Sequence, residues 1–247
     1  MLEKVEGFVI KTQDYGETNK IVTVFSINAG KFAVIAKGAK KPKSRMAALT
    51  QPFICAQFLV YPSKRLGSLQ QGDILDSFRA IREDIVKTAY AAYIAELTDK
   101  LLENHEPDTY IYDQFKRTMQ WIATESQAEV PVLMYELKLF QKAGFAPIVD
   151  HCARCGRTDQ LTAFSVAEGG ILCRFCFPHS SDAVVLPANL AKLFKLFAKI
   201  GLERVGTVAV KPENMRLMRQ LMDTYYDQYG GLFLKSRKFL NQLDMFQ

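Results

Sequence analysis

Four of the five cysteines are spaced as metal ligands. Cys152 and Cys155 form one C-x2-C pair, and Cys173 and Cys176 form a second pair after 17 intervening residues. A C-x2-C pair turns two thiolates toward one ion, and two such pairs complete the tetrahedral shell that zinc prefers. We therefore expect one structural zinc ion in a zinc ribbon. An iron–sulfur cluster and redox pairs are the alternatives, and four thiolates leave no open position for hydrolytic chemistry.

The neighbouring residues of similar chemistry are weaker candidates. His151 and His179 flank the cysteines, but four thiolates already fill the shell, so neither is expected to bind the ion. Cys55 lies in an apolar run and is expected to be a small buried side chain. The N-terminus lacks a signal-peptide pattern and no long apolar run occurs, so we expect no membrane span and a cytoplasmic location, where paired cysteines more often hold metal than form disulfides.

A second group of residues is suited to binding phosphates. Five cations occupy nine positions between two expected strands: Lys37, Lys40, Lys41, Lys43 and Arg45. Residues 1–80 hold twelve basic and six acidic side chains, which accounts for the whole net charge of +6. Long cations on a loop follow phosphates without reading the base sequence, so we expect nucleic-acid binding. The alternative is a solvated loop that only aids solubility.

Further residues extend this expected DNA-binding set. Lys64 and Arg65 lie in a second turn and widen the basic surface. Tyr15 and Tyr61 lie at or beside turns, where aromatic rings can stack on bases, whereas the phenylalanines lie within apolar runs. For each tyrosine a packing role is equally consistent with the sequence.

No catalytic motif is present. The chain has no G-x-x-x-x-G-K-[ST], G-x-G-x-x-G, G-x-S-x-G or H-E-x-x-H pattern and no D-x-D pair. Its three histidines do not stand in a pattern typical of a general base. We therefore expect a protein that is not an enzyme, and above all not a nucleotide-hydrolysing motor.

The elements that must position these residues change in character near residue 80. Before it, short runs rich in Val, Ile and Phe alternate with turn residues and predict strands at 5–10, 21–27, 32–36, 53–61 and 68–74. Five strands in so short a segment suit a small barrel. The oligonucleotide-binding (OB) fold is one such barrel, and a fragment of a β-sandwich is the alternative.

After residue 80 the apolar residues recur at helical spacing. They predict a helix that Pro107 ends, a helix over residues 108–124, and a third from Pro131 to Gly144. Helical stripes return at residues 190–200, 215–225 and 239–243. We therefore expect an α+β multidomain chain, with a barrel in residues 1–80, a helical domain in two parts, 81–149 and 181–247, and a cysteine module in residues 150–180 inserted between them.

Several segments resemble the RecO family of bacterial DNA repair proteins. In the first part these are Gly7-Phe-Val-Ile, Tyr15-Gly-Glu17, Ala36-Lys37-Gly38-Ala39-Lys40-Lys41 and Leu49-Thr-Gln-Pro52-Phe53. In the second part these are Tyr135-Glu136-Leu137, Gly144-Phe145-Ala-Pro147, and Phe164-Ser165 through Gly169-Gly170 to Cys173. The segments follow the family's order over nearly the full length.

The resemblance implies a function as well as a fold. It implies an OB barrel, a helical domain and an inserted zinc ribbon. It also implies a non-enzymatic recombination mediator that binds single- and double-stranded DNA, anneals complementary strands, acts with RecR and RecF at the nucleoid, and helps RecA displace single-strand-binding protein. The acidic tail of single-strand-binding protein is then expected to dock on the helical domain, where Lys192, Lys195 and Lys199 share one helix face; an ordinary surface helix looks the same.

A transcription or RNA-associated factor that reads nucleic acid with the cysteine module is the main alternative. Arg154, Arg157 and Arg174 lie beside the cysteines and favour it, but the nearby acids Asp150, Asp159 and Glu168 balance their charge. A zinc-dependent scaffold without nucleic-acid binding is a second alternative. Separate binding tests of residues 1–80 and 81–247 distinguish the three.

Overall fold

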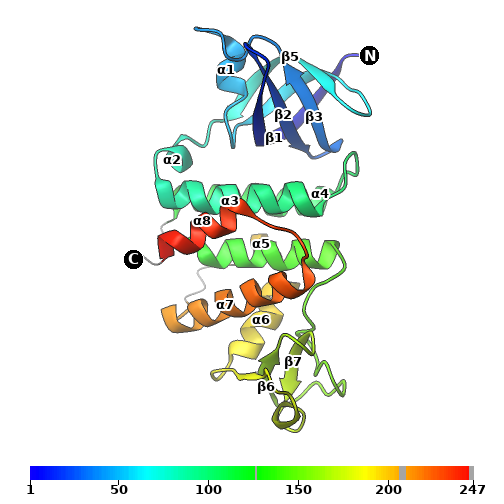
Figure 1. Cartoon of the computed structure of the whole chain (residues 1–247), viewed down its shortest axis with the longest axis vertical. Coiled ribbons are helices and arrows are strands. Elements are labelled where there is room, and N and C mark those ends of the chain that lie inside the picture. Colours follow the sequence, from blue (N-terminus) through cyan, green and yellow to red (C-terminus); the bar gives the residue numbers. More distant parts are fainter. Residues whose placement is uncertain (126, 206–209, 245–247) are drawn as a thin grey trace. The chain divides into compact units, whose positions relative to one another are not determined.

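Figure 1 shows the computed structural model of the chain, which describes residues 1–125, 127–205 and 210–244. Contacts between Cα atoms divide the chain into two compact units. The first comprises Met1–Ala128 together with Leu234–Gln247, and the second comprises Glu129–Phe233. Within the described ranges, no helix is long and apolar enough to cross a membrane.

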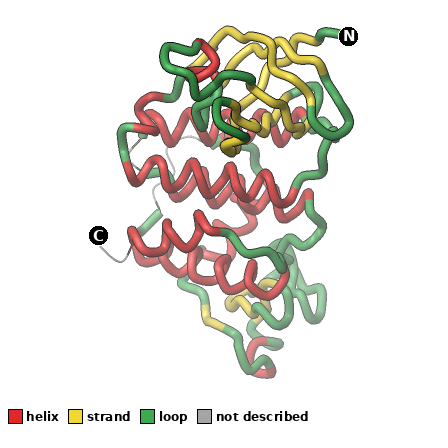
Figure 2. The backbone as a smooth tube through the Cα atoms, turned by 45° about the horizontal axis from the view of Figure 1, so that its top comes forward, coloured by secondary structure: helices red, strands yellow, loops and turns green. Residues whose placement is uncertain are grey.

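The first unit begins with a closed five-stranded barrel (Figure 2). Its strands are β1 (Glu3–Tyr15), β2 (Asn19–Ser26), β3 (Gly30–Ala36), β4 (Cys55–Tyr61) and β5 (Gly67–Asp76). They follow the order β1-β2-β3-β5-β4, and β1 pairs with β4 to close the barrel. Only β3 and β5 pair in parallel. The short helix α1 (Arg45–Leu49) lies between β3 and β4. The expected barrel is confirmed, and it has the OB fold rather than that of a sandwich.

The barrel closes because alternate residues of its strands are apolar. Val22, Val24 and Val34 are completely buried in the barrel core. Ile21 and Thr23, which alternate with them on β2, are only half-buried. Side chains of successive strand residues point to opposite faces, so these two lie on the outside of the barrel. Branched side chains such as valine also fit the pleated backbone well.

Besides α1, the helices described in the first unit are α2 (Arg79–Arg82), α3 (Ile85–Leu101), α4 (Thr109–Thr124) and α8 (Lys235–Asp244). Asp84 and Asp108 cap α3 and α4 by accepting hydrogen bonds from amides of the first turn. The sequence predicted that Pro107 would end the helix that the structure shows as α3. This prediction was wrong, because α3 already ends at Leu101. The segment after it bonds to the barrel instead: the His105 amide donates to the Lys31 carbonyl, at 2.9 Å.

Aromatic packing joins the barrel to α4. The rings of Phe8 and Phe25 both contact Tyr112 and Phe115, with centroids 5.1 to 5.7 Å apart. Contacts of this kind add to the free energy gained from burying the rings. The barrel is therefore built onto the helices of its own unit rather than being attached by a linker alone.

Helix α5 (Glu129–Lys142) is the buried helix of the second unit, since every residue from Val130 to Phe140 is buried. Helices α6 (Leu190–Lys199) and α7 (Pro212–Tyr229) pack against it, and the short turn η2 (Leu202–Arg204) lies between them in the chain. The Phe140 ring stacks on Tyr226 at 5.6 Å. Arg219 pairs with the fully buried carboxylate of Glu136. Burying this charge without a partner would destabilise the fold.

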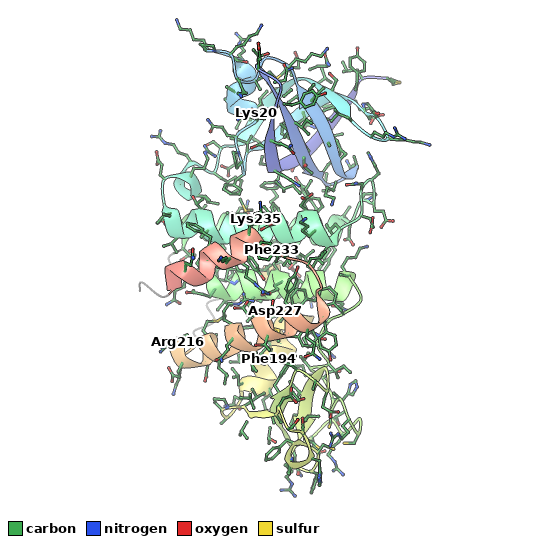
Figure 3. The ribbon with its side chains drawn as sticks, viewed as in Figure 1. Lys20, Phe194, Arg216, Asp227, Phe233 and Lys235 are labelled. Atoms are coloured by element: carbon green, nitrogen blue, oxygen red, sulfur yellow. The ribbon has the colours of Figure 1, made fainter. Side chains whose placement is uncertain are left out.

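The cysteine module is inserted between α5 and α6. It contains the hairpin of β6 (Leu161–Ser165) and β7 (Gly170–Cys173), the turn η1 (Phe177–His179) and the short strand β8 (Val184–Val185). The sheet order is β7-β6-β8. Phe164 of β6 stacks on Phe194 of α6, labelled in Figure 3, with centroids 5.6 Å apart. The expected class of barrel, helical region and inserted cysteine module is thus confirmed.

Candidate functional site

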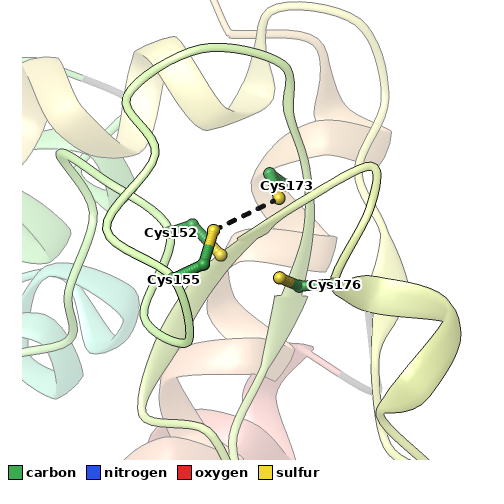
Figure 4. Close-up of side chains that lie close together, drawn as sticks. All are labelled: Cys152, Cys155, Cys173 and Cys176. Atoms are coloured by element: carbon green, nitrogen blue, oxygen red, sulfur yellow. Dashed lines mark hydrogen bonds between the residues drawn. The ribbon is translucent and has the colours of Figure 1, made fainter.

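The four cysteine sulfurs converge on one point (Figure 4). All four Sγ atoms lie within 4.8 Å of one another, and those of Cys155 and Cys173 are 3.8 Å apart. Zinc–sulfur bonds of about 2.3 Å in a tetrahedron place sulfurs about 3.8 Å apart. The cluster therefore has about the size of a tetrahedral metal site.

Two turns and one hairpin produce this convergence. In the first pair the Gly156 amide donates to the Cys152 carbonyl at 2.8 Å, and in the second the Cys176 amide donates to the Cys173 carbonyl at 3.0 Å. The β6–β7 hairpin brings the second turn beside the first. Gly170 lets the segment before the first turn lie against β7, because a Cβ atom at position 170 would lie 2.2 Å from the Ile148 carbonyl oxygen.

The thiols influence one another strongly. Burial alone would raise the pKa of Cys152, but amides of Cys173, Cys155 and Arg154 donate to its sulfur and lower that pKa to about 6. Burial and the neighbouring sulfurs raise the pKa of Cys176 to about 12. Cys152 therefore favours the thiolate form and Cys176 the thiol form, and a cation bound between the sulfurs would favour the thiolate form of both.

Neither flanking histidine belongs to the cluster. Among the described residues, the only groups of potential ligands that converge are the four cysteine sulfurs. The His151 ring instead lies against Asp150, with Nδ1 and Oδ1 2.7 Å apart. Cys55 is separate from the cluster and buried in the first unit, as expected.

The basic loop (residues 37–45) is fixed to the barrel at several points. The Gly38 amide donates to Asn19 Oδ1 at 2.9 Å, and the Lys40 amide donates to the Thr18 carbonyl at 2.9 Å. Ala39, within the loop, is buried, and Ser44 caps α1. All five cations of the loop are exposed: Lys37, Lys40, Lys41, Lys43 and Arg45. The loop therefore presents cations from a defined backbone position at the β1–β2 turn.

Lys40 differs from the other cations of the basic loop. Its ammonium lies 2.7 Å from Asp14 Oδ2. The hydrogen bond from Lys40, together with the charges of Lys40 and Lys20, holds the pKa of Asp14 below its usual range. Lys20 lies on β2 (Figure 3). Asp14 therefore stays ionised at neutral pH and competes with any phosphate for Lys40.

The predicted stacking residues belong to one outer surface of the barrel. Tyr15 is 48% exposed and ends β1 on the hairpin that holds the basic loop; Tyr61 is 49% exposed and ends β4. Tyr61 pairs with Ser68, Ser68 with Ile35, and Ile35 with Ile21. Ile21 pairs in turn with Gln13, two residues before Tyr15. Register partners share one face. Sequence reasoning missed Ile21 and Ile35 as surface residues, and the alternation along β2 and β3 is the signal that places them outside. Lys64 and Arg65 lie exposed in the separate β4–β5 connection.

The three helix lysines are not equivalent either. Lys192 and Lys195 are exposed on α6, and Leu196 beside them is 39% exposed. Lys199 lies 3.2 Å from the Asp150 carboxylate and so forms an ion pair within its own unit. Lys192 and Lys195 are therefore the exposed cations of this set that do not pair with Asp150.

A cavity of 770 Å³ lies in the first unit, between β1, α3 and α8. Its acidic groups are already held by structural partners. Glu96 accepts hydrogen bonds from the Ser236 amide and hydroxyl at the start of α8, and Asp99 pairs with Lys11 at 2.9 Å. These two acids therefore link α3 to α8 and to β1 at the wall of the cavity.

Comparison with known proteins gives one consistent result. Residues 1–78 match the family model described as "Recombination protein O N terminal", and residues 82–238 match "Recombination protein O C terminal". A protein of Oceanobacillus iheyensis named "DNA repair protein RecO" is 54% identical over 246 residues, which cover 100% of this chain and 95% of that protein. Proteins of the same name from Bacillus cytotoxicus and Bacillus pumilus are 46% and 42% identical; the matches cover 100% and 99% of this chain and 100% and 95% of those proteins.

Proposed function

The chain belongs to the RecO family of DNA repair proteins, and from this we propose that it is a non-enzymatic recombination mediator. In this role it binds single- and double-stranded DNA, anneals complementary strands, and helps RecA replace single-strand-binding protein. The observation that carries the proposal is the basic loop, whose exposed cations are fixed to the β1–β2 turn of an OB barrel.

Phosphate neutralisation is the proposed basis of DNA binding. Lys37, Lys41, Lys43 and Arg45 are exposed, and no ion pair holds them within the described chain. Each cation that meets a phosphate releases a condensed counterion, which favours binding at low salt and carries no base preference. Lys64 and Arg65 extend this surface at the β4–β5 connection.

Base contacts are proposed for the outer face of the barrel. The Tyr15 and Tyr61 rings are about half exposed. The row of paired residues that starts at Tyr61 passes through Ile35 and Ile21 and reaches Gln13, two residues before Tyr15. Unpaired bases can stack on such rings, whereas bases inside a duplex cannot reach them. The face therefore supports binding of single strands, while the loop cations contact the backbone of either form.

Annealing follows from the same charges without a chemical step. Two complementary strands repel each other, and fixed cations lower that repulsion while leaving the base edges free to pair. Nothing in this process requires a nucleophile, a general base or nucleotide hydrolysis. The protein's contribution is to hold two strands close together at reduced repulsion.

A zinc ion is the proposed occupant of the four-cysteine site. Cys152, Cys155, Cys173 and Cys176 would hold it, and it would cross-link the two turns and supply folding free energy to the cysteine module. The sulfur atoms of all four ligands are used in this arrangement, so the metal is given a structural role.

The remaining proposals concern partners and organisation. RecR, RecF, RecA and single-strand-binding protein are the proposed partners, and the cytoplasmic nucleoid is the proposed location. The exposed pair Lys192 and Lys195 beside Leu196 supports docking of an acidic, apolar tail on α6. We assign DNA binding to residues 1–80 and partner binding to the helical segments, 81–149 and 181–247, around the module of residues 150–180.

The test replaces Lys37, Lys41 and Lys43 by alanine in the full-length chain. With a slope of about 0.7 per phosphate contact on single strands, losing three contacts lowers the salt slope by about 2 and weakens binding about 50-fold at ~0.15 M salt. The matched control removes three exposed lysines elsewhere, Lys100, Lys211 and Lys238, and should leave the slope unchanged.

The second measurement is annealing of complementary strands coated with single-strand-binding protein, without ATP. Wild type and the control variant should accelerate annealing, and the loop variant should not. Equal salt slopes for the loop variant and the control would contradict the assignment of the loop. Absence of annealing by wild type would contradict the mediator function itself.

A further inference from the structure

The tip of the cysteine module carries an aromatic ring that two guanidinium groups contact. Phe175 stands between the ligands Cys173 and Cys176 and is 50% exposed. The Arg174 guanidinium lies 4.6 Å from the centroid of its ring, and that of Arg157 lies 5.0 Å from it. Arg157 follows the first C-x2-C turn, and its carbonyl accepts a hydrogen bond from the Cys152 amide at 2.7 Å. The two cysteine turns thus hold all three side chains, which we call the tip cluster.

The acids of the module do not neutralise the tip cluster as their number suggests. Glu168 pairs with Arg154, and Asp150 pairs with Lys199 and His151. Asp182 accepts hydrogen bonds from Ser165, Ser180 and the Ala167 amide. Asp159 remains, 3.5 Å from one nitrogen of Arg157. Two arginines at the tip therefore face a single acid.

Arg154, the third arginine of the cysteine module, is fixed by other partners. It is bonded to Glu168 and to the carbonyl oxygens of Cys176 and His179. Arg157 and Arg174 instead lie over an exposed ring, and this position calls for a different role.

The chemistry of the tip cluster matches a nucleic-acid strand. A guanidinium packed over an aromatic face keeps its N–H groups at the edge, where they can bind a phosphate in two-pronged fashion. Half of the Phe175 ring stays exposed to solvent, whereas a phenylalanine that serves only in packing is usually buried. A half-exposed ring offers an unpaired base a surface for stacking.

We infer that Arg157, Phe175 and Arg174 form a second single-stranded-DNA contact surface, with the arginines on phosphates and the ring against an unpaired base. This inference rests on the proposed function, since it requires that the protein binds DNA. It extends that function by giving the cysteine module a direct part in binding. A protein that anneals strands gains from a contact surface outside its barrel, because two strands must be held at once.

The test uses the full-length, metal-loaded protein and a single-stranded oligonucleotide of mixed sequence. Replacing Arg157 and Arg174 together by alanine should lower the salt slope by about 1.4 and weaken binding about 14-fold at ~0.15 M salt. The matched control replaces Arg204 and Arg216, two exposed arginines of the same unit, and should keep the wild-type slope. Equal metal content in every variant shows that the module is folded.

A second variant reports on stacking directly. Phe175→Trp keeps an aromatic ring and adds a fluorophore to a chain whose one native tryptophan is Trp121. Its fluorescence should fall when the oligonucleotide binds, by more than that of wild type. An unchanged slope in the double-arginine variant, or quenching no greater than in wild type, would overturn the inference and leave the tip cluster to a protein partner. Wild-type protein that fails to bind DNA would instead refute the proposed function.

Discussion

Replacing Asp14 by asparagine is expected to strengthen DNA binding. Asp14 is the carboxylate that holds Lys40, with 2.7 Å between the charged atoms. Its pKa is lowered by the hydrogen bond from Lys40, so the pair persists at neutral pH. Asparagine keeps the shape of the side chain but removes the charge, which frees Lys40 to meet a phosphate.

The size of the effect follows from one added contact. On single-stranded DNA a contact contributes about 0.7 to the salt slope, which corresponds to about fourfold tighter binding at ~0.15 M salt and little change near ~1 M. The charge of Lys20 also lowers the pKa of Asp14, and a gain above fourfold would indicate that this lysine is released as well.

Equilibrium titrations over a range of salt concentrations measure both the slope and the affinity. Asp14→Glu serves as the control because it retains a carboxylate, and it should behave as wild type. In the double variant Asp14→Asn, Lys40→Ala the gain assigned to Lys40 should disappear. If Asp14→Asn binds no more tightly than wild type, or if its slope does not rise, the basic loop is not the surface that meets the phosphates.

Two further predictions concern the second unit and the thiols. A chelator strong enough to remove the metal should make four thiols reactive toward Ellman's reagent. Cys55 is buried, and burial raises its pKa to about 11, so this thiol should react only after unfolding. Five thiols that react together in folded protein would contradict this prediction. Lys138 donates to the Phe197 carbonyl from a buried position, and burial lowers its pKa to about 8. Between about pH 8 and 10.4 the unfolded chain therefore binds more protons than the folded chain, and the free energy of unfolding should rise with pH by at most about 3 kcal/mol relative to Lys138→Met. Urea unfolding of both proteins at several pH values measures this difference, and a difference independent of pH would refute the assignment.

Much of the fold could be predicted because its signals are local. Apolar residues alternate in the barrel strands and recur at helical spacing after them, and the double C-x2-C spacing by itself indicates convergent sulfurs. The end of α3 could not be predicted in this way. α3 ends at Leu101, and the segment before Pro107 is held by a bond from His105 to Lys31, a residue far away in the sequence. A contact of this kind leaves no local signal.

The outer face of the barrel was hidden for a different reason. Ile21 and Ile35 belong to apolar runs, and hydropathy alone assigns such residues to the core. Strand register decides otherwise: Ile21 pairs with Ile35, while Val22 pairs with Val34 on the opposite, buried face. A shift of one residue would exchange the two faces, so the identity of the exposed row depends on pairing between strands and not on either run by itself.

Ion pairing made by tertiary structure also changes the meaning of charge counted along the chain. A linear count gives Lys40 the same weight as Lys37, and it lets Glu168 cancel Arg174. In the structure the β1–β2 hairpin delivers Asp14 to Lys40, and the β6–β7 hairpin delivers Glu168 to Arg154 instead. Whether a cation can bind a phosphate depends on the absence of a competing carboxylate within a few ångströms, because that partner must be displaced first. Lys40 of the barrel is therefore less available to a phosphate than the sequence implies, and Arg174 of the cysteine module is more available. The net charge of each part is the same in both descriptions.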